Sequence, residues 1–188
     1  MKAKLLPVLL LLFSLSAFSQ SFDGVAIDGV LSIAISKYKE KGYEVVSKEK
    51  EIAILKGTAA GKKITLFLVT TPKSKMIYKA VIFLPVREDW QSLKDDYEKY
   101  KEILTNKYGK PTSNYQKFKD PYKEGYGDEM SAVINKNCQY VSYWLDDKEN
   151  TNIAVEISDT KQIQITYENV KNSNIREKEK LEIEKSVF

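Results

Sequence analysis

The chain contains no histidine and only one cysteine among its 188 residues. Histidine is the commonest general base near neutral pH and the commonest metal ligand in proteins. Its absence excludes every histidine-containing catalytic triad and leaves no ordinary set of ligands for zinc or copper. We therefore expect no catalytic, cofactor-binding or metal-binding residues. Any enzyme built on this sequence would depend on carboxylates, lysines, tyrosines or serines alone.

The single cysteine, Cys138, has no partner for a disulfide within the chain. In an oxidising compartment such a residue is most simply a small buried hydrophobic side chain. A reactive free thiol, or a disulfide to a second copy of the chain, are the two alternatives.

No apolar run reaches the roughly 20 residues that a transmembrane helix requires. The longest, Leu5–Leu15, follows two lysines and precedes Ala17 and Ser19, small residues suited to a cleavage site. These three parts are typical of a secretory signal peptide, which we place at residues 1–20. The alternative, a buried N-terminal helix, does not explain the pattern. We expect an exported protein, periplasmic or secreted, with no membrane span after cleavage.

The formal net charge is small, with 30 basic and 26 acidic residues and a value of +4. Removal of Lys2 and Lys4 with the signal peptide lowers it to +2. Because acids and bases also alternate along the chain, as on an ordinary solvated surface, we expect no nucleic-acid partner.

The clearest element is a helix within residues 87–111. Its large apolar residues recur every three or four positions, which places them on one helix face: Trp90, Leu93, Tyr97, Tyr100 and Leu104. Asp89 stands where an N-cap is expected, Gly109 where a C-cap is expected, and Pro111 follows. The acids and lysines of the opposite side are expected to form a solvated face.

An earlier helix is expected over residues 28–41, with Asp28-Gly29 at its start. Four short strands joined by tight turns should follow as an antiparallel meander, at residues 43–48, 52–56, 63–71 and 76–84. The last two are apolar on both faces, which predicts that they are central and that something covers their second face.

After the central helix the pattern predicts a second set of elements. These are a strand at 114–118, a loop at 119–127, a short helix at 128–136 capped by Asp128, and strands at 139–146, 152–158 and 161–168. Apolar and polar residues alternate in the last two strands, so one face of the sheet should be packed and the other wet. The charged tail, 171–188, is expected to be loosely docked, with a helix starting near residue 173.

The fold class predicted from these elements is α+β. About eight antiparallel strands would form one sheet from two α-β-β-β-β units, with both helices packed on one face. Residues 21–170 would be a single domain, with a candidate internal duplication of 24–86 and 87–170.

Several segments resemble a group of uncharacterised exported proteins from Bacteroidetes. They include IDGVLSIAISKYKEKGY, LKGTAAGKKITLFLV, LTNKYGKP and IQITYENVKNSN. The tandem arrangement of a helix and four strands is also similar to the β-lactamase-inhibitor-protein architecture. That similarity implies an expected topology, and it carries over neither a function nor an inhibitory residue.

Three polar motifs were weighed as chemical sites. The segment 57–62, GTAAGK, is one residue short of a phosphate-binding loop and precedes a strand, so a hairpin turn explains it better. Asp146-Asp147, with Glu149 and Asn150, does not match an EF-hand, and a β-turn accounts for it. Asp95-Asp96 are adjacent in a helix, where side chains point about 100° apart, so they cannot share a site.

Tyrosine is abundant, with 12 residues. Five fall on expected core faces, where packing explains them: Tyr38, Tyr78, Tyr97, Tyr100 and Tyr167. Tyr115, Tyr122 and Tyr126 lie in or beside the Gly/Pro-rich loop and form a candidate contact surface, because tyrosine buries a large area and keeps a polar group. The alternative is that the loop folds back on the sheet.

The predicted function is an exported, non-enzymatic module that binds an envelope or extracellular protein, a peptide or a glycan. Its binding surface would be the wet face of the last two strands or the tyrosine loop. The alternative is a small carboxylate-dependent hydrolase acting on an envelope or dietary glycan, which requires two acids about 5–10 Å apart in a cleft. A third hypothesis, a structural envelope component or chaperone-like factor, is not distinguished from the first by sequence.

Overall fold

The computed structural model describes residues 20–146 and 151–187. The predicted signal peptide, apart from its last residue, lies outside the described residues, as does most of the acidic segment weighed as a calcium site. The described chain contains four helices, one large sheet and one two-stranded sheet. The predicted α+β class is therefore confirmed.

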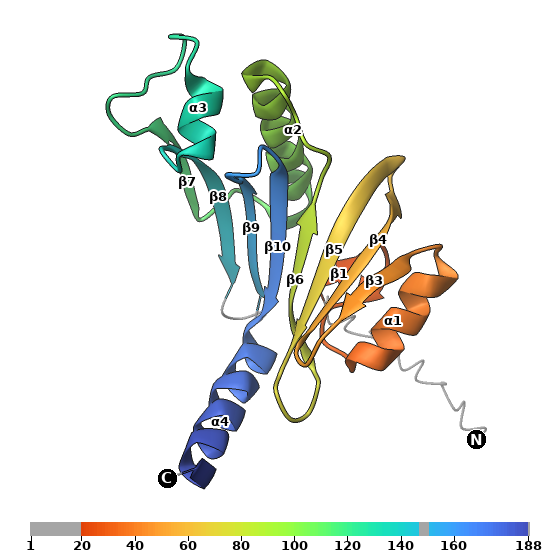
Figure 1. The fold of residues 1–188 in the computed structure, drawn as a ribbon. Helices are drawn as coiled ribbons and strands as arrows, with labels where there is room; N and C mark the ends of the chain where they lie inside the picture. Colours follow the sequence, from red (N-terminus) through yellow and green to blue (C-terminus); the bar gives the residue numbers. More distant parts are fainter. Residues whose placement is uncertain (1–19, 147–150, 188) are drawn as a thin grey trace, which may run out of the picture.

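The large sheet has eight antiparallel strands in the order β3-β4-β5-β6-β10-β9-β8-β7. Their bounds are β3 Glu44–Lys48, β4 Ile52–Ala59, β5 Lys62–Thr70, β6 Ile77–Phe83, β7 Ser113–Phe118, β8 Cys138–Asp146, β9 Thr151–Ile157 and β10 Ile163–Asn169. Strands β6 and β10 lie side by side at the centre, so the strands before and after the central helix meet there (Figure 1). A small hairpin of β1 (Ser21–Phe22) and β2 (Val25–Ala26) precedes the first helix.

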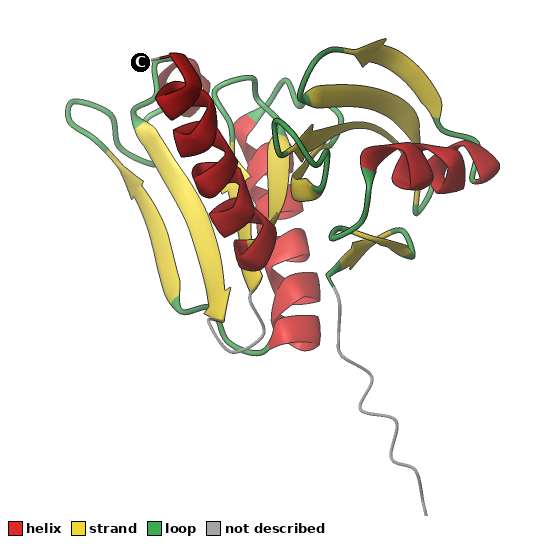
Figure 2. Cartoon of the chain, turned by 90° about the horizontal axis from the view of Figure 1, so that it is seen from below, coloured by secondary structure: helices red, strands yellow, loops and turns green. Residues whose placement is uncertain are grey.

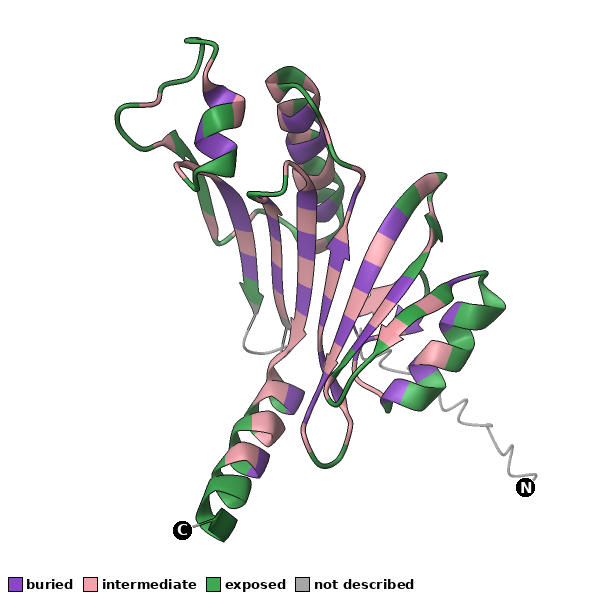
Figure 3. Cartoon of the chain, viewed as in Figure 1, coloured by how far each residue is buried: buried purple, intermediate pink, exposed green. Residues whose placement is uncertain are grey.

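The four helices are α1 Leu31–Glu40, α2 Trp90–Tyr108, α3 Glu129–Ile134 and α4 Val170–Val187. Buried side chains of α1 and α2 belong to one apolar core with buried residues of β4, β5, β6, β8, β9 and β10. Buried and half-buried residues alternate along the central strands (Figure 3). One face of the sheet therefore packs against α1 and α2, as alternation in the sequence predicts.

Helix α2 has the predicted caps and the predicted buried face. The Asp89 carboxylate accepts a hydrogen bond from the Ser92 N–H at 2.8 Å, and Gly109 ends the helix with φ +83°. Leu93, Tyr97 and Leu104 are buried. The two other predicted apolar residues, Trp90 and Tyr100, are partly buried against the same core.

The charged side of α2 differs from the prediction. Asp96 is only 7% exposed, and its carboxylate accepts hydrogen bonds from Arg87 Nε at 2.7 Å and Lys62 Nζ at 3.2 Å. Burial by itself would raise the pKa of Asp96, but the two cationic donors outweigh it and lower that pKa. Asp96 therefore ties α2 to β5 and does not belong to a solvated face.

Three details of these elements differ from the prediction, the first two because of pairing with another segment. Helix α1 begins at Leu31, since Val30 forms a β-bridge with Met76, the residue before β6. Strand β4 continues through Gly57 to Ala59, because it pairs with β5 along its whole length. Asp128 makes no side-chain cap on α3.

The tail forms a continuous helix that starts at Val170, three residues before the predicted start. It leaves the end of the sheet and points away from it (Figure 1), and it lies in front when the chain is seen from below (Figure 2). The Asn172 amide donates to the carbonyls of Ile77 (2.7 Å) and Asp28 (3.1 Å). The Glu179 carboxylate accepts from the Lys73 N–H at 2.6 Å. These contacts hold the first half of α4, and its far end is exposed.

Among the helices of the described residues, none combines the length and the apolar content needed to cross a bilayer.

Candidate functional site: the open face of the sheet

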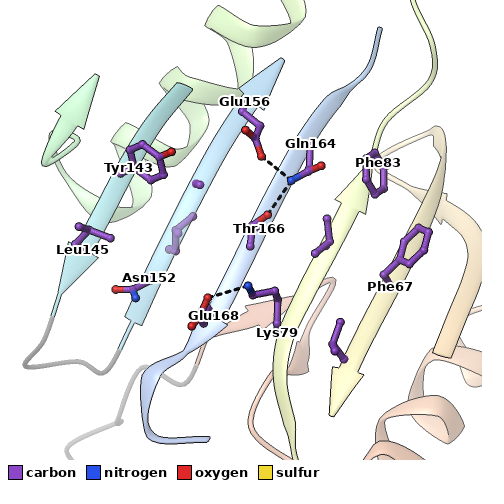
Figure 4. Close-up of a pocket in the computed structure, with 14 residues that line it drawn as sticks. Phe67, Lys79, Phe83, Tyr143, Leu145, Asn152, Glu156, Gln164, Thr166 and Glu168 are labelled. Atoms are coloured by element: carbon purple, nitrogen blue, oxygen red, sulfur yellow. Dashed lines mark hydrogen bonds and ion pairs between the residues drawn. The ribbon is translucent and has the colours of Figure 1, made fainter. Parts of the chain in front are cut away.

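The sheet face opposite α1 and α2 contains a hollow of about 640 Å³. It is open to solvent and is formed by strands β5, β6, β10, β9 and β8 (Figure 4). We call this surface the open face. Its side chains are Phe67, Val69, Lys79, Val81, Phe83, Tyr143, Leu145, Asn152, Ala154, Glu156, Gln164, Thr166 and Glu168. All of them are half-buried except Leu145, which is exposed.

Strand register explains why these residues share one face, since directly paired residues of neighbouring strands point the same way. One row runs through Tyr115, Val141, Glu156, Gln164 and Phe83. The next runs through Tyr143, Ala154, Thr166, Val81 and Phe67. The third runs through Leu145, Asn152, Glu168, Lys79 and Val69.

One half of the open face is apolar. We call it the apolar half, and it consists of Phe67 and Val69 on β5 with Val81 and Phe83 on β6. The Phe67 and Phe83 rings pack edge to face with centroids 5.4 Å apart. The sequence predicted that something covers this second face, but no described helix or loop does so, and the four side chains stay half-buried. Because large uncovered apolar patches mark sites where proteins bind other molecules, we take the apolar half as a candidate binding surface.

The other half, on β8, β9 and β10, is polar. We call it the polar half. Gln164 Nε2 donates to Glu156 Oε1 at 2.6 Å, and more weakly to Thr166 Oγ1 at 3.4 Å. At the boundary with the apolar half, Lys79 forms an ion pair with Glu168 at 3.1 Å. Figure 4 shows both sets of contacts.

Glu156 is the electrostatically unusual residue of the polar half. Burial raises the pKa of its carboxyl group, the hydrogen bond from Gln164 opposes this, and the charge of Asp159 adds to the rise. Burial also raises the pKa of Tyr143, with contributions from the nearby Glu156 and Tyr115. Among the ion pairs formed by the described residues, none includes Glu156. Within the described part of the chain, this half-buried carboxylate thus has one neutral donor and no cationic partner.

The three tyrosines of the predicted contact surface lie in different surroundings. Tyr115 is 44% exposed and continues the first row of the open face at the sheet edge. Tyr126 is 73% exposed on the loop beyond that edge. Tyr122 is half-buried, and its hydroxyl accepts a hydrogen bond from Asn135 at 3.2 Å. Of the three, only Tyr115 is aligned with the open face.

The open face does not contain the paired acids that the hydrolase alternative requires. Its two acids are Glu156 on β9 and Glu168 on the neighbouring strand β10. They are offset by four residues along the strand direction. Ordinary strand spacing therefore puts their Cα atoms about 14 Å apart. Glu168 is already paired with Lys79. A glycosidase pair would be about 5–10 Å apart with both carboxyl groups facing one bond.

Cys138 lies at the start of β8, partly buried against the core. Burial, together with the charge of Glu124, raises the pKa of its thiol to about 12. Since the thiolate is the reactive form, a thiol with this pKa is inert near neutral pH. The interpretation of Cys138 as a small hydrophobic residue accords with this environment.

The sequence contained the signals for both halves of the open face, but not their proximity. Phe67 and Val81 appeared as the second apolar face of central strands, and Glu156 and Gln164 as the wet face of the last strands. Pairing of β6 with β10 brings these sets together. Nothing local in either strand specifies that partner.

No protein-family model, curated protein or solved structure matches this chain. The resemblances of the sequence segments to other proteins therefore stay predictions.

Proposed function

We propose that this chain is an exported, non-enzymatic binding module that holds a partner protein against the open face of its sheet. The observation that carries the proposal is the apolar half, where two phenylalanines and two valines remain half-buried with no covering element among the described residues. The predicted signal peptide supports export to the periplasm or the medium. A partner there would bury the apolar half and so gain about 25 cal/mol for each Å² removed from water.

The chemistry of the face favours a protein over a glycan or a substrate. The apolar half offers no hydrogen-bonding side chain to the hydroxyl groups of a sugar. An apolar centre beside hydrogen-bonding groups is instead the usual composition of a protein-binding surface. The acids of the face are too far apart for glycoside hydrolysis.

Site-specific photocrosslinking in the native envelope tests the proposal. We would replace Val81, in the middle row of the apolar half, with a benzoyl-phenylalanine residue and express the full chain in its own host. A discrete crosslinked protein is expected. The matched control places the same residue at Ile103, which is 48% exposed on α2. No discrete adduct is expected from that position.

A second variant separates binding from general adhesion. Phe67→Lys puts a charge in the apolar half and should abolish the Val81 adduct, whereas Ile103→Lys should leave it intact. Circular dichroism melting establishes that both variants are folded. Equal adducts at positions 81 and 103, or an adduct that survives Phe67→Lys, would refute the proposal.

We also propose that the sheet arose from two α-β-β-β-β units. Strands β3 to β6 and strands β7 to β10 are each neighbours in chain order, and each set follows a helix, α1 or α2. The sets meet at β6 and β10. On this proposal, the short helix α3 is an insertion in the second unit.

A further inference from the structure

The open face holds a charge that residues 20–146 and 151–187 leave uncompensated. Glu156 is half-buried, and its one hydrogen bond comes from a neutral amide, Gln164 Nε2, at 2.6 Å. The other acid of the face, Glu168, has Lys79 as a cationic partner at 3.1 Å. Taking a carboxylate partly out of water without a cation is unfavourable, and a partner's cation would relieve that cost.

Two tyrosines lie on the same face as Glu156, both on its β8 and β7 side. Tyr115 is joined to Glu156 through Val141 in one row of paired residues. Tyr143 is two residues along β8 from Val141 and pairs with Ala154, two residues from Glu156 on β9. Aromatic rings attract cations through their faces. The Tyr115 ring already has the exposed Lys117 above it, with Nζ 5.9 Å from the centroid.

An apolar site lies at a fixed distance from this carboxylate. Phe83 is two strands away from Glu156 in the same row, with Gln164 between them. Neighbouring strands are about 4.8 Å apart, so the two positions are separated by about 10 Å. A basic side chain and an apolar side chain two or three residues apart on an extended segment can span this distance.

We infer that the partner is a protein segment that seats an arginine or lysine side chain at Glu156, beside Tyr143, and an aromatic or aliphatic side chain on the apolar half. This inference rests on the proposed function, since it specifies what the open face binds. A second copy of the chain is a different occupant, and the experiment below distinguishes it.

The probe is a library of random 12-residue peptides displayed on phage, selected against the full mature chain. Enriched peptides should combine a basic residue with an aromatic or aliphatic residue a few positions away. One enriched peptide is then synthesised with its basic residue intact and replaced by glutamine, and fluorescence anisotropy gives both dissociation constants. We expect the intact peptide to bind about tenfold or more tightly, which corresponds to about 1.4 kcal/mol.

The variant Glu156→Gln tests the carboxylate directly. It should bind the intact and the neutral peptide equally well, because the coupling between the two charges has been removed. Glu102→Gln is the matched control, since Glu102 is exposed on α2 and should leave the tenfold difference unchanged. In a thermal melt, Glu156→Gln should raise the Tm of the free chain. A carboxyl group whose pKa is raised by folding destabilises the fold when ionised, and the amide avoids that penalty.

Every outcome is decisive. Peptides that bind through Phe67 but show no preference for a basic residue would overturn the inference and leave the proposed function standing. If no peptide is enriched whose binding Phe67→Lys abolishes, both the inference and the proposed function are overturned. Sedimentation analysis of the free chain completes the test, because a dimer that Phe67→Lys dissociates would mean that a second copy occupies the face.

Discussion

Gly57 should be intolerant of a side chain, although nothing in its backbone requires glycine. It pairs with Ile64 inside β4, and it is not among the residues with positive φ. Its special feature is the Tyr43 ring, which lies directly over it. A Cβ atom at position 57 would be 2.4 Å from Tyr43 Cδ1 and 2.6 Å from Cγ. Such contacts do not occur between unstrained atoms, so Gly57→Ala must displace the ring.

The ring has little freedom to move. Tyr43 is 2% exposed, packs edge to face on Tyr38 with centroids 5.1 Å apart, and donates its hydroxyl hydrogen to Asp23 at 3.1 Å. Overpacking a well-packed core costs about 1–3 kcal/mol. Loss of the aromatic pair adds about 0.5–1.5 kcal/mol. The smaller backbone entropy of the unfolded alanine chain returns about 0.4–1 kcal/mol. We expect the free energy of unfolding to fall by about 2 kcal/mol.

Urea unfolding followed by tryptophan fluorescence measures this loss as a lower midpoint with an unchanged m-value. Gly29→Ala is the control, because a Cβ there has no atom within 4 Å and should be neutral or slightly stabilising. In a Tyr43→Ala background, Gly57→Ala should also become neutral or stabilising. A harmless Gly57→Ala in the native background, or an equal cost without the ring, would show that the Tyr43 ring does not exclude a side chain at position 57.

Three further predictions concern buried polar groups. Asp96→Asn should lower the free energy of unfolding by about 1–2 kcal/mol at pH 7. This is less than a fully buried ion pair would contribute, because solvent partly screens Arg87 and Lys62. The pKa of Asp96 is lowered in the folded state. The contribution of Asp96 to stability is therefore present above the unfolded-state pKa near 4 and is lost as the pH falls through the folded-state pKa. In urea titrations, the difference in stability between the native chain and Asp96→Asn should vanish towards pH 2. Cys138 should react with iodoacetamide at pH 7.5 only in denaturant, since burial raises the pKa of its thiol to about 12. Labelling of the native chain at the rate of free cysteine would contradict this prediction. Asn172→Ala removes the amide that donates to two backbone carbonyls, so the free energy of unfolding should fall by about 1–3 kcal/mol. Hydrogen exchange in α4 should become faster. Unchanged exchange there would show that the helix is held by other contacts.

Local periodicity was sufficient for the elements that pack one face on a core. The three- and four-residue spacing of α2 predicted its buried residues, and Asp89 and Gly109 predicted its ends, because caps and helical faces are set by neighbours in sequence. The two-residue alternation of β9 and β10 likewise predicted which face is packed.

Prediction failed where a distant segment decides the local structure. The start of α1 was misplaced because Val30 bridges to Met76, 46 positions along the chain. Asp96 was assigned to a solvated face, but Arg87 and Lys62 cover it. The small hairpin of β1 and β2 was not predicted, since its two-residue strands are too short to show alternation.

The sequence by itself determined the α+β class, the long helix, most strands and the absence of histidine chemistry, because composition and period are local properties. Only the tertiary structure decided that β6 pairs with β10, and hence that Phe67 and Phe83 share a surface with Glu156. Strand pairing over such a distance depends on which edges remain free after the other strands have paired, and no residue pattern within a strand encodes it. The open face, and with it the proposed function, therefore depends on the pairing of β6 with β10.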